Sequence, residues 1–326
     1  MPRMLACGAI NWDTTLFVDS LPSAGEELRV SRIVSVPGGK GANVASSAAR
    51  ILGHSHVGIV GGLGTDDIAS RQLRILEGEG VDTSCIVQKD GSASGEAFII
   101  VDKSSGENMI LTHMSANDLD VESFSSAYLK RLDDFIAKSE MVVVIDPPLE
   151  FALFLADRAA YTDKILLLSP SLLTRRGFAS LRVYLDKAHL ILLNESEARL
   201  LASSDDPVRA GEEISTELGK QVIVTLGSRG CMFISNGKRV LIPPLDLGSY
   251  GLRTVSTVGA GDSFLGAFSA FKLRGLDDIE SIFLANIAAA LKTTSEETRG
   301  SPRLEEIQKY SEDRKMRLVL ESLRLS

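Results

Sequence analysis

The feature that most restricts the fold of this chain is a regular alternation of short apolar runs with longer segments of helical periodicity. The apolar runs contain mainly Val, Ile and Leu, which is typical of strands buried on both faces of a sheet. Helices between such strands cover both faces of a parallel sheet. We predict strands at 4–10, 56–62, 141–146, 164–170, 189–194 and 221–227, and helices at about 43–53, 66–79, 122–138, 149–160, 195–203 and 206–218.

Residues at the ends of the predicted strands are candidates for function, because ligands of parallel α/β sheets bind at the carboxyl ends of the strands. Asp146, Ser169, Asn194 and Gly227 occupy such positions. The 326 residues are enough for one large α/β domain or for a domain with a subsidiary lobe.

Two segments depart from the alternation. Residues 14–35 and 93–112 have apolar residues at alternate positions around Pro/Gly and Ser/Gly turns, which predicts hairpins. Neither hairpin has a helix of its own to cover it. We therefore expect the two hairpins to pair into a small sheet that projects from the body as a lid.

The charge and the distribution of apolar residues exclude some partners. A net charge of −8 argues against nucleic-acid binding, which needs clustered Lys and Arg. The start of the chain is too short and weakly charged for a signal peptide, and no apolar run reaches the ~18 residues of a membrane span. We expect a cytoplasmic protein that binds neither nucleic acid nor membranes.

The cysteines and histidines indicate neither a disulfide framework nor a metal site. Cys7, Cys85 and Cys231 are widely spaced, odd in number and without a CxxC pair. His54 and His56 lie on one side of an extended segment, but no third ligand is near them in the sequence. A solvated or partly buried pair is the favoured interpretation.

The stretch "STVGAGDSFLGAF" (256–268) places small residues and one acid at the start of an apolar helix. The unpaired N–H groups of a helix N-terminus stabilise anions, and Gly259, Ala260 and Gly261 would let a ligand approach the backbone. Asp262 lies in the first turn of that helix. A glycine turn followed by a favourable first-turn acid explains the stretch equally well in isolation.

The stretch "VPGGKGANVASSAARIL" (36–52) is a glycine-rich turn followed by a helix that starts near Ala42. Gly38, Gly39 and Gly41 permit unusual backbone angles, and Asn43 could cap the helix or bind hydroxyl groups. The stretch matches neither GxGxxG nor the P-loop pattern in full. The small residues of the helix would let it lie close to the sheet.

Two shorter motifs each have a structural alternative. Asn194 ends a strand and Glu197 is in the first turn of the next helix, so the pair could hold Mg²⁺ through water or could form a capping box. The sequence "TLGSRGC" (225–231) is a strand followed by a Gly-x-x-Gly loop, which could be a binding loop or a hairpin turn.

Together and in this order, the motifs resemble those of the ribokinase (PfkB) family of carbohydrate kinases. "PGGKGANVASSAARIL" and "STVGAGDSFLGAF" are similar to its two signatures, and "GAINWD", "GGLGTDDIASRQL", "EGVDTS", "NESE" and "TLGSRG" are similar to the elements between them. The resemblance extends from about residue 5 to about residue 305. It implies a doubly wound, mostly parallel α/β body (1–13, 36–92 and 113–326) and a small β-sheet lid (14–35 and 93–112).

The resemblance also implies roles for individual residues. Asp262 would be the catalytic base, and the adjacent small residues would form the anion hole. The positions similar to the family's sugar-binding residues are Asp13, Gly39, Lys40, Asn43 and Asp146. Those similar to its nucleotide-binding residues are Asn194, Thr225, Gly227, Ser228, Gly230 and Asn286. Asn194 and Glu197 are similar to its magnesium-binding pair. ATP and Mg²⁺ are the implied cofactors. In several members the lid is also the dimer interface, which makes a homodimer possible here.

The chain departs from the family pattern at two places. Ser256 stands where the usual "DTxGAGD" motif has an Asp that helps to hold a monovalent cation, which puts activation by K⁺ in doubt. Asp146 stands where ribokinase-like members have Glu, and the shorter acid could alter which sugar fits.

The expected activity is transfer of the γ-phosphate of ATP to a hydroxymethyl group of a sugar. A nucleoside kinase and a sugar-phosphate kinase are alternatives. A sugar phosphate would need extra basic residues near the sugar, and Lys40, Arg29 and Arg32 are the only nearby candidates in the sequence. A non-catalytic sugar or nucleotide sensor is disfavoured by the intact "GAGD", and a dinucleotide-dependent oxidoreductase by the lack of GxGxxG after the first strand.

Overall fold

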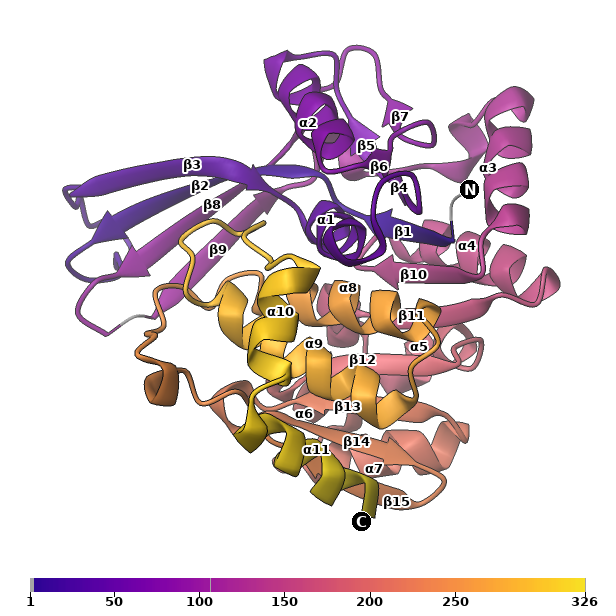
Figure 1. Ribbon diagram of the computed structural model, residues 1–326. Coiled ribbons are helices and arrows are strands. Elements are labelled where there is room, and N and C mark those ends of the chain that lie inside the picture. The colour runs from indigo at the N-terminus through magenta and orange to yellow at the C-terminus, as the bar shows by residue number, and fades with distance from the viewer. Residues whose placement is uncertain (1–2, 106, 326) are drawn as a thin grey trace.

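The computed structural model describes residues 3–105 and 107–325, and its centre is a large, mostly parallel sheet (Figure 1). All six predicted strands lie in this sheet as neighbours, each slightly shorter than predicted. Their order is β13-β12-β11-β10-β1-β4, and every pair among them is parallel. Their bounds are β1 (Met4–Gly8), β4 (Val57–Val60), β10 (Met141–Ile145), β11 (Ile165–Ser169), β12 (Leu190–Asn194) and β13 (Gln221–Thr225).

The two edges of the sheet contain strands beyond the six predicted ones, and of these only β14 (Cys231–Ser235) is implied by the hairpin alternative for 225–231. At one edge β6 (Val81–Asp82) pairs in parallel with β4; at the other, β14 and β15 (Lys238–Ile242) add an antiparallel meander. Two short strands outside this sheet, β5 (Gly62–Leu63) and β7 (Val87–Gln88), pair with each other. The "TLGSRGC" loop is thus the turn of the β13–β14 hairpin.

Helices cover both faces, as predicted for a parallel sheet. Alternate residues of β1 point into two hydrophobic cores, one on each face of the sheet. Met4 and Ala6 belong to the first core, and Leu5 and Cys7 belong to the second. The first core is covered by α1 (Lys40–Leu52), α2 (Asp67–Gly78), α8 (Ala260–Leu273), α9 (Asp278–Lys292), α10 (Leu304–Ser311) and α11 (Arg314–Leu325). The second is covered by α3 (Ser126–Lys138), α4 (Leu149–Tyr161), α5 (Phe178–Leu185), α6 (Glu195–Ala202) and α7 (Pro207–Leu218).

The predicted helix bounds need correction at two N-termini. The segment 122–138 divides into a short 3-10 turn and α3, because Ser125 accepts the backbone N–H of Tyr128 and so caps a new helix. Helix α1 begins at Lys40, before the predicted start, because Gly39 takes a φ of +90° and turns the chain directly into the helix. No helix in the described ranges is long and apolar enough to span a bilayer.

The two predicted hairpins form one four-stranded sheet, in the order β3-β2-β8-β9, that projects from the body (Figure 1). Its strands are β2 (Asn11–Val18), β3 (Arg32–Gly38), β8 (Gly95–Asp102) and β9 (Asn108–His113). Parallel pairing of β2 with β8 joins the hairpins. The β2–β3 ladder continues inward to Asn11 and Gly38, so this sheet includes residues that the sequence assigned to the body.

Helices α1 and α8 pack closely because small residues face each other. A Cβ on Gly266 would lie 2.6 Å from the Cβ of Ser47, and one on Gly41 would lie 2.5 Å from the backbone of Gly8 in β1. The hydroxyl of Ser47 donates to the carbonyl of Ser263 at 3.0 Å. The N-termini of both helices therefore meet at the carboxyl edge of the central sheet.

Candidate active site

Two adjoining cavities lie at the carboxyl edge of the central sheet. The inner cavity, about 350 Å³, lies between the small sheet and the N-termini of α1 and α8. The outer cavity, about 900 Å³, lies between the β13–β14 loop, α8 and α9. Asn194, Thr225, Thr257 and Gly261 line both. The two cavities therefore meet at the first turn of α8.

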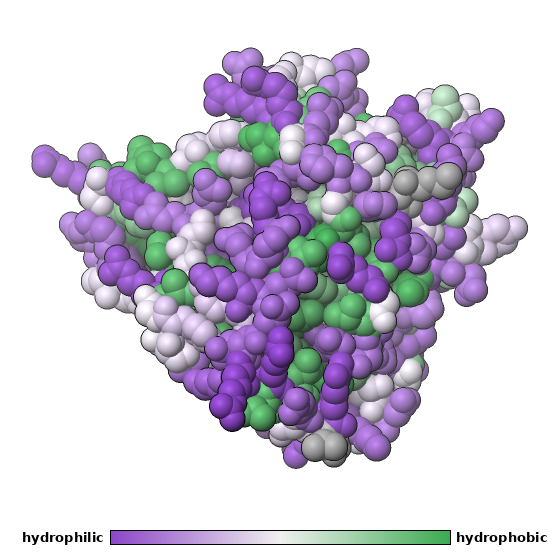
Figure 2. All heavy atoms as spheres, viewed as in Figure 1, coloured by the Kyte–Doolittle hydropathy of each residue, from purple (hydrophilic) through white to green (hydrophobic). Residues whose placement is uncertain are grey.

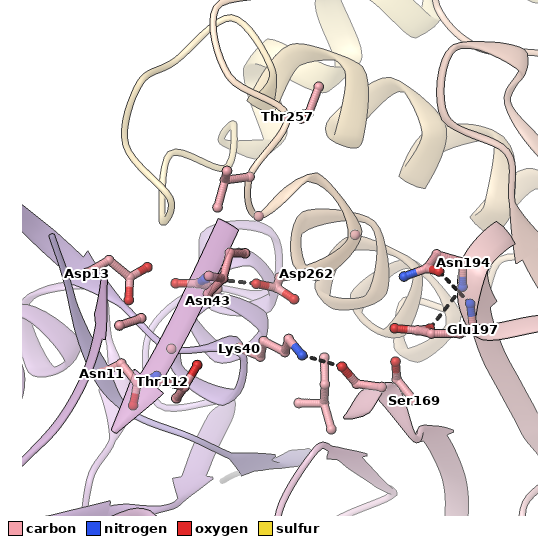
Figure 3. Close-up of a pocket in the computed structure, with 18 of the residues that line it drawn as sticks. Asn11, Asp13, Lys40, Asn43, Thr112, Ser169, Asn194, Glu197, Thr257 and Asp262 are labelled. Carbon is pink, nitrogen blue, oxygen red and sulfur yellow. Dashed lines mark hydrogen bonds between the residues drawn. The ribbon is translucent and has the colours of Figure 1, made fainter. Parts of the chain in front are cut away.

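Asp262 lies at this junction and is the acid whose position the sequence predicted. It lines the inner cavity but is only 9% exposed. The side-chain amide of Asn43 donates to its Oδ2 at 2.8 Å (Figure 3). Burial raises the pKa of Asp262, while the Asn43 hydrogen bond and the charges of Lys40 and Lys292 act in the opposite direction. The carboxylate is thus oriented and partly desolvated.

A buried arginine supports Asn43 from behind. Arg299 is 2% exposed; its Nη2 donates to the carbonyl of Gly38 at 2.6 Å and its Nε approaches Asn43 Oδ1 at 3.4 Å. Burial lowers the pKa of Arg299 to about 10, against the opposing charge of Asp13. Sequence reasoning missed Arg299, because the segment "SEETRGS" contains no pattern that marks a buried cation.

The predicted acceptor residue Asp13 lies on β2 and faces the inner cavity. Burial raises its pKa to about 6, against a hydrogen bond with Thr298 and the charge of Arg299. Alternation along the strands puts Ala97, Ile99 and Thr112 on the same face of the small sheet, where they also line the cavity. The opposite face is directed away from the site.

Lys40 and Asp146 form an ion pair, with Nζ 2.8 Å from Oδ2. The backbone N–H of Leu172 donates to the other oxygen of Asp146 at 3.0 Å, and Lys40 also donates to Ser171. Lys40 lines the inner cavity; Asp146 is not among the described residues that line either cavity. Ser169 (Figure 3) lines the wall there instead. Ser171 lines it as well.

The predicted magnesium pair forms a capping box. The backbone N–H of Glu197 donates to Asn194 Oδ1 at 2.9 Å, and that of Asn194 donates to Glu197 Oε2 at 3.0 Å (Figure 3). Both side chains nevertheless line the inner cavity, and burial raises the pKa of Glu197. Within residues 3–105 and 107–325, no group of three or more His, Cys, Asp or Glu is arranged to hold a metal ion. His54 and His56 precede β4, at the opposite edge of the sheet.

At the N-terminus of α8, Gly259 has a φ of +81°, which few side chains tolerate. A Cβ on Gly259 would also lie 2.3 Å from the carbonyl oxygen of Thr298. At Gly261, by contrast, a Cβ would meet nothing within 4 Å, and the space beyond is the junction of the two cavities. The backbone of Gly261 therefore borders the junction, whereas the N–H of Ala260 donates to the carbonyl of Thr257 at 3.2 Å.

The remaining predicted nucleotide residues line the outer cavity: Gly227, Ser228, Gly230 and Asn286. Ala260 of the predicted anion hole lines it as well. The amide nitrogen of Asn286 donates to the carbonyl of Ile242 at 3.1 Å, which ties α9 to β15. Asn11 and Thr257 also line the cavities, although sequence reasoning did not name them. Asn11 lies two residues before Asp13 in "GAINWD", and Thr257 directly follows Ser256 in "STVGAGD".

The family description "pfkB family carbohydrate kinase" matches residues 1–305. The chain belongs to this family. The predicted family and the predicted fold are thereby confirmed.

Curated relatives and solved structures agree with this assignment. The ribokinase of Bacillus subtilis is 29% identical over 90% of this chain and 94% of its own length. The deoxyribokinase of Salmonella typhi is 27% identical over 91% of this chain and 95% of its own length. The structure of Thermotoga maritima ribokinase matches with a TM-score of 0.81 at 25% identity, covering 96% of this chain and 100% of that one. A Burkholderia thailandensis nucleoside kinase shares the fold, with a TM-score of 0.79 at 19% identity over 95% of this chain and 98% of that one.

Replacing Asn43 by Ala should destabilise this kinase in a pH-dependent way. The change removes a hydrogen bond to a buried carboxylate and should lower the free energy of unfolding by about 1–3 kcal/mol. The pKa of Asp262 is already raised by burial, so the folded protein loses stability as pH rises and this group ionises; without Asn43 that loss grows. Urea unfolding at acidic and neutral pH measures the difference.

Ser47→Ala is the matched control on the same helix, because Ser47 donates to a neutral carbonyl. Ser47→Ala should lower the free energy of unfolding by the same amount at both pH values. If Asn43→Ala also lowers it equally at acidic and neutral pH, the hydrogen bond from Asn43 does not stabilise the ionised form of Asp262.

Proposed function

We propose that this protein transfers the γ-phosphate of ATP to a hydroxymethyl group of a neutral sugar bound in the inner cavity. The observation that supports this most is the position of Asp262, a buried carboxylate at a helix N-terminus where two cavities meet. The names of the relatives, ribokinase and deoxyribokinase, suggest a pentose.

In this proposal Asp262 takes the proton of the attacking hydroxyl. Its raised pKa makes it a better proton acceptor than an exposed aspartate. Phosphoryl transfer otherwise depends on positioning and on stabilisation of the charge on the transferred group. The backbone N–H groups at Gly259 and Gly261, with the positive end of α8, would supply that stabilisation, and Ala260 would add its N–H on release of the Thr257 carbonyl.

The nucleotide would occupy the outer cavity, with its terminal phosphates at Gly261. Thr225, Gly227, Ser228, Gly230, Asn194 and Asn286 would be its contacts. Magnesium is usually held by one or two carboxylates together with substrate phosphates, so Glu197 beside the junction fits a nucleotide-borne Mg²⁺. That ion would neutralise charge on the phosphates.

The charges of the inner cavity favour a neutral acceptor over a sugar phosphate. The carboxylates of Asp13, Glu197 and Asp262 line it, and Lys40, which also lines it, is already paired with Asp146. A second phosphate would meet more negative than positive charge. A nucleoside is the second candidate, because Ile99 and Ile110 give the sheet side of the cavity an apolar surface that could contact a base.

We also propose that the small sheet is a lid over the inner cavity and an interface between two copies of the chain. Its inner face lines the cavity, whereas its outer face exposes Ile33, Phe98, Met109 and Leu111. Apolar side chains are visible on this sheet among hydrophilic ones in Figure 2. An exposed apolar face of this kind is typical of a protein–protein contact.

ADP release in the presence of ATP and Mg²⁺, measured over a panel of ribose, deoxyribose, fructose, nucleosides and fructose phosphates, tests the function. We expect turnover of a neutral pentose and little with sugar phosphates. Asp262→Asn should lower kcat on the order of 10³-fold while retaining ligand binding. Tight binding without turnover of any acceptor would instead indicate a sensor, and a near-normal kcat for Asp262→Asn would refute the base.

Gly261→Ala separates stability from catalysis. The new methyl group meets no protein atom, and alanine favours a helix over glycine by about 1 kcal/mol, so thermal stability should be kept or increased. The methyl group enters the space proposed for the phosphates, so kcat/KM should fall on the order of 10²-fold. Differential scanning fluorimetry and initial rates measure both; an Ala variant with normal kcat/KM would refute the phosphate position.

Leu111→Glu tests the interface. A charge on the outer face of the small sheet should convert a dimer to a monomer in light scattering coupled to size exclusion, because the buried charge would be unpaired. Leu200→Glu, an exposed leucine on α6, should leave the oligomeric state unchanged. A dimer that survives Leu111→Glu would place the interface elsewhere.

A further inference from the structure

Lys292, the last residue of α9, is a fully buried lysine that the proposed mechanism does not use. Its Nζ donates to the backbone carbonyl of Ser256 at 3.4 Å. Within the described residues it makes no ion pair with a carboxylate inside 4.0 Å. Burying an ammonium without a paired carboxylate is costly, so its place in the fold needs an explanation.

The lysine lies directly behind the proposed anion hole. A Cβ on Gly259 would lie 3.5 Å from Lys292 Cε, so the side chain packs against the turn that begins α8. Lys292 is not among the residues that line either cavity. Its charge therefore acts through the 256–261 loop and does not touch a bound molecule.

Asp262 of α8 is the charged group that acts on Lys292, and each shifts the pKa of the other toward its ionised form. Burial is the larger effect on the lysine and lowers its pKa to about 8. The nearby charges of Asp13 on β2 and Arg299 act mainly on one another. The ammonium is thus retained at neutral pH and lost as pH rises above about 8.

Both oxygens of Ser256 already accept a hydrogen bond from within the protein. The carbonyl accepts from Lys292, and the hydroxyl accepts from the backbone N–H of Val258 at 3.4 Å. Ser256 also has no negative charge with which to hold a cation. A second cation beside the ammonium would in addition be repelled by it.

We propose that Lys292 is a built-in cation that holds the 256–261 loop in its anion-binding form and replaces a free monovalent ion. The inference rests on the proposed kinase activity. It makes Lys292 a positioning residue: it fixes the Ser256 carbonyl and adds positive charge behind the backbone N–H groups of α8. The expected consequence is that turnover does not depend on K⁺.

The experiment compares the wild type, Lys292→Met, and the double variant Ser256→Asp/Lys292→Ala. Rates are measured with K⁺, Na⁺ or tetramethylammonium at constant ionic strength. The wild type should be indifferent to the cation. Lys292→Met should lose about 10-fold to 100-fold in kcat with little change in KM, as for other supporting groups of a site. The double variant should regain activity with K⁺ alone.

The pH profile gives a readout that a purely structural role would not move. The wild-type kcat should fall above about pH 8, where Lys292 loses its proton, and Lys292→Met should lack this alkaline decline. Lys272→Met is the control: Lys272 is a partly buried lysine on α8 that pairs with Asp278 at 2.7 Å, far along the helix from the loop. Its rates and pH profile should match those of the wild type.

Thermal melting with and without KCl tests the inference independently of turnover. The double variant should melt at a higher temperature in KCl than in tetramethylammonium chloride. The wild type should melt at the same temperature in both salts. K⁺ activation of the wild type, or an unchanged kcat and pH profile in Lys292→Met, would overturn the inference. Absence of turnover with every acceptor would refute only the kinase proposal. The melting comparison would still show whether the 256–261 loop binds K⁺ in the double variant and not in the wild type.

Discussion

The close packing of α1 against α8 determines the geometry of the whole site. Glycine and serine at the contact let the two helices approach until Asn43, on one helix, donates to Asp262, on the other. These residues are 219 positions apart in the chain. A larger side chain at Gly266 would separate the helices, and the carboxylate would lose both its partner and its position at the junction of the cavities. Core packing and site geometry therefore depend on the same contact.

The second constraint is electrostatic. Asp13, Asp262, Lys292 and Arg299 are all buried within one region, where each ionised group is costly to desolvate. Burial shifts every one of their pKa values toward the neutral form, while opposite charges and hydrogen bonds act against it. A well-packed apolar region would be more stable, so the cluster is best explained by function: an oriented base with fixed positive charge behind it.

The small sheet links the site to the surface through simple alternation. Residues such as Asp13, Ile99 and Thr112 face the inner cavity, and their neighbours Phe98 and Leu111 face outward. Closure of this sheet over a sugar would exclude water from the reacting groups and so limit hydrolysis of the nucleotide. An apolar outer face would at the same time be available to a second copy of the chain.

The sequence by itself determined the elements and the motifs, and the tertiary structure determined which side chains meet. Buried strands, helices and the glycine-rich turns at 38–41 and 259–261 are encoded locally, by periodicity and by residues that tolerate special backbone angles, so they were predictable. The edge strand β15 was not, because an antiparallel extension depends on what covers it, and for β14 the sequence left a hairpin and a binding loop open. Local pattern did offer the capping box of Asn194 and Glu197 as an alternative, but it could not show that Lys40 pairs with Asp146 or that Lys292 and Arg299 lie behind the site. A buried cation has no sequence signature, since its environment consists of residues brought together only by folding.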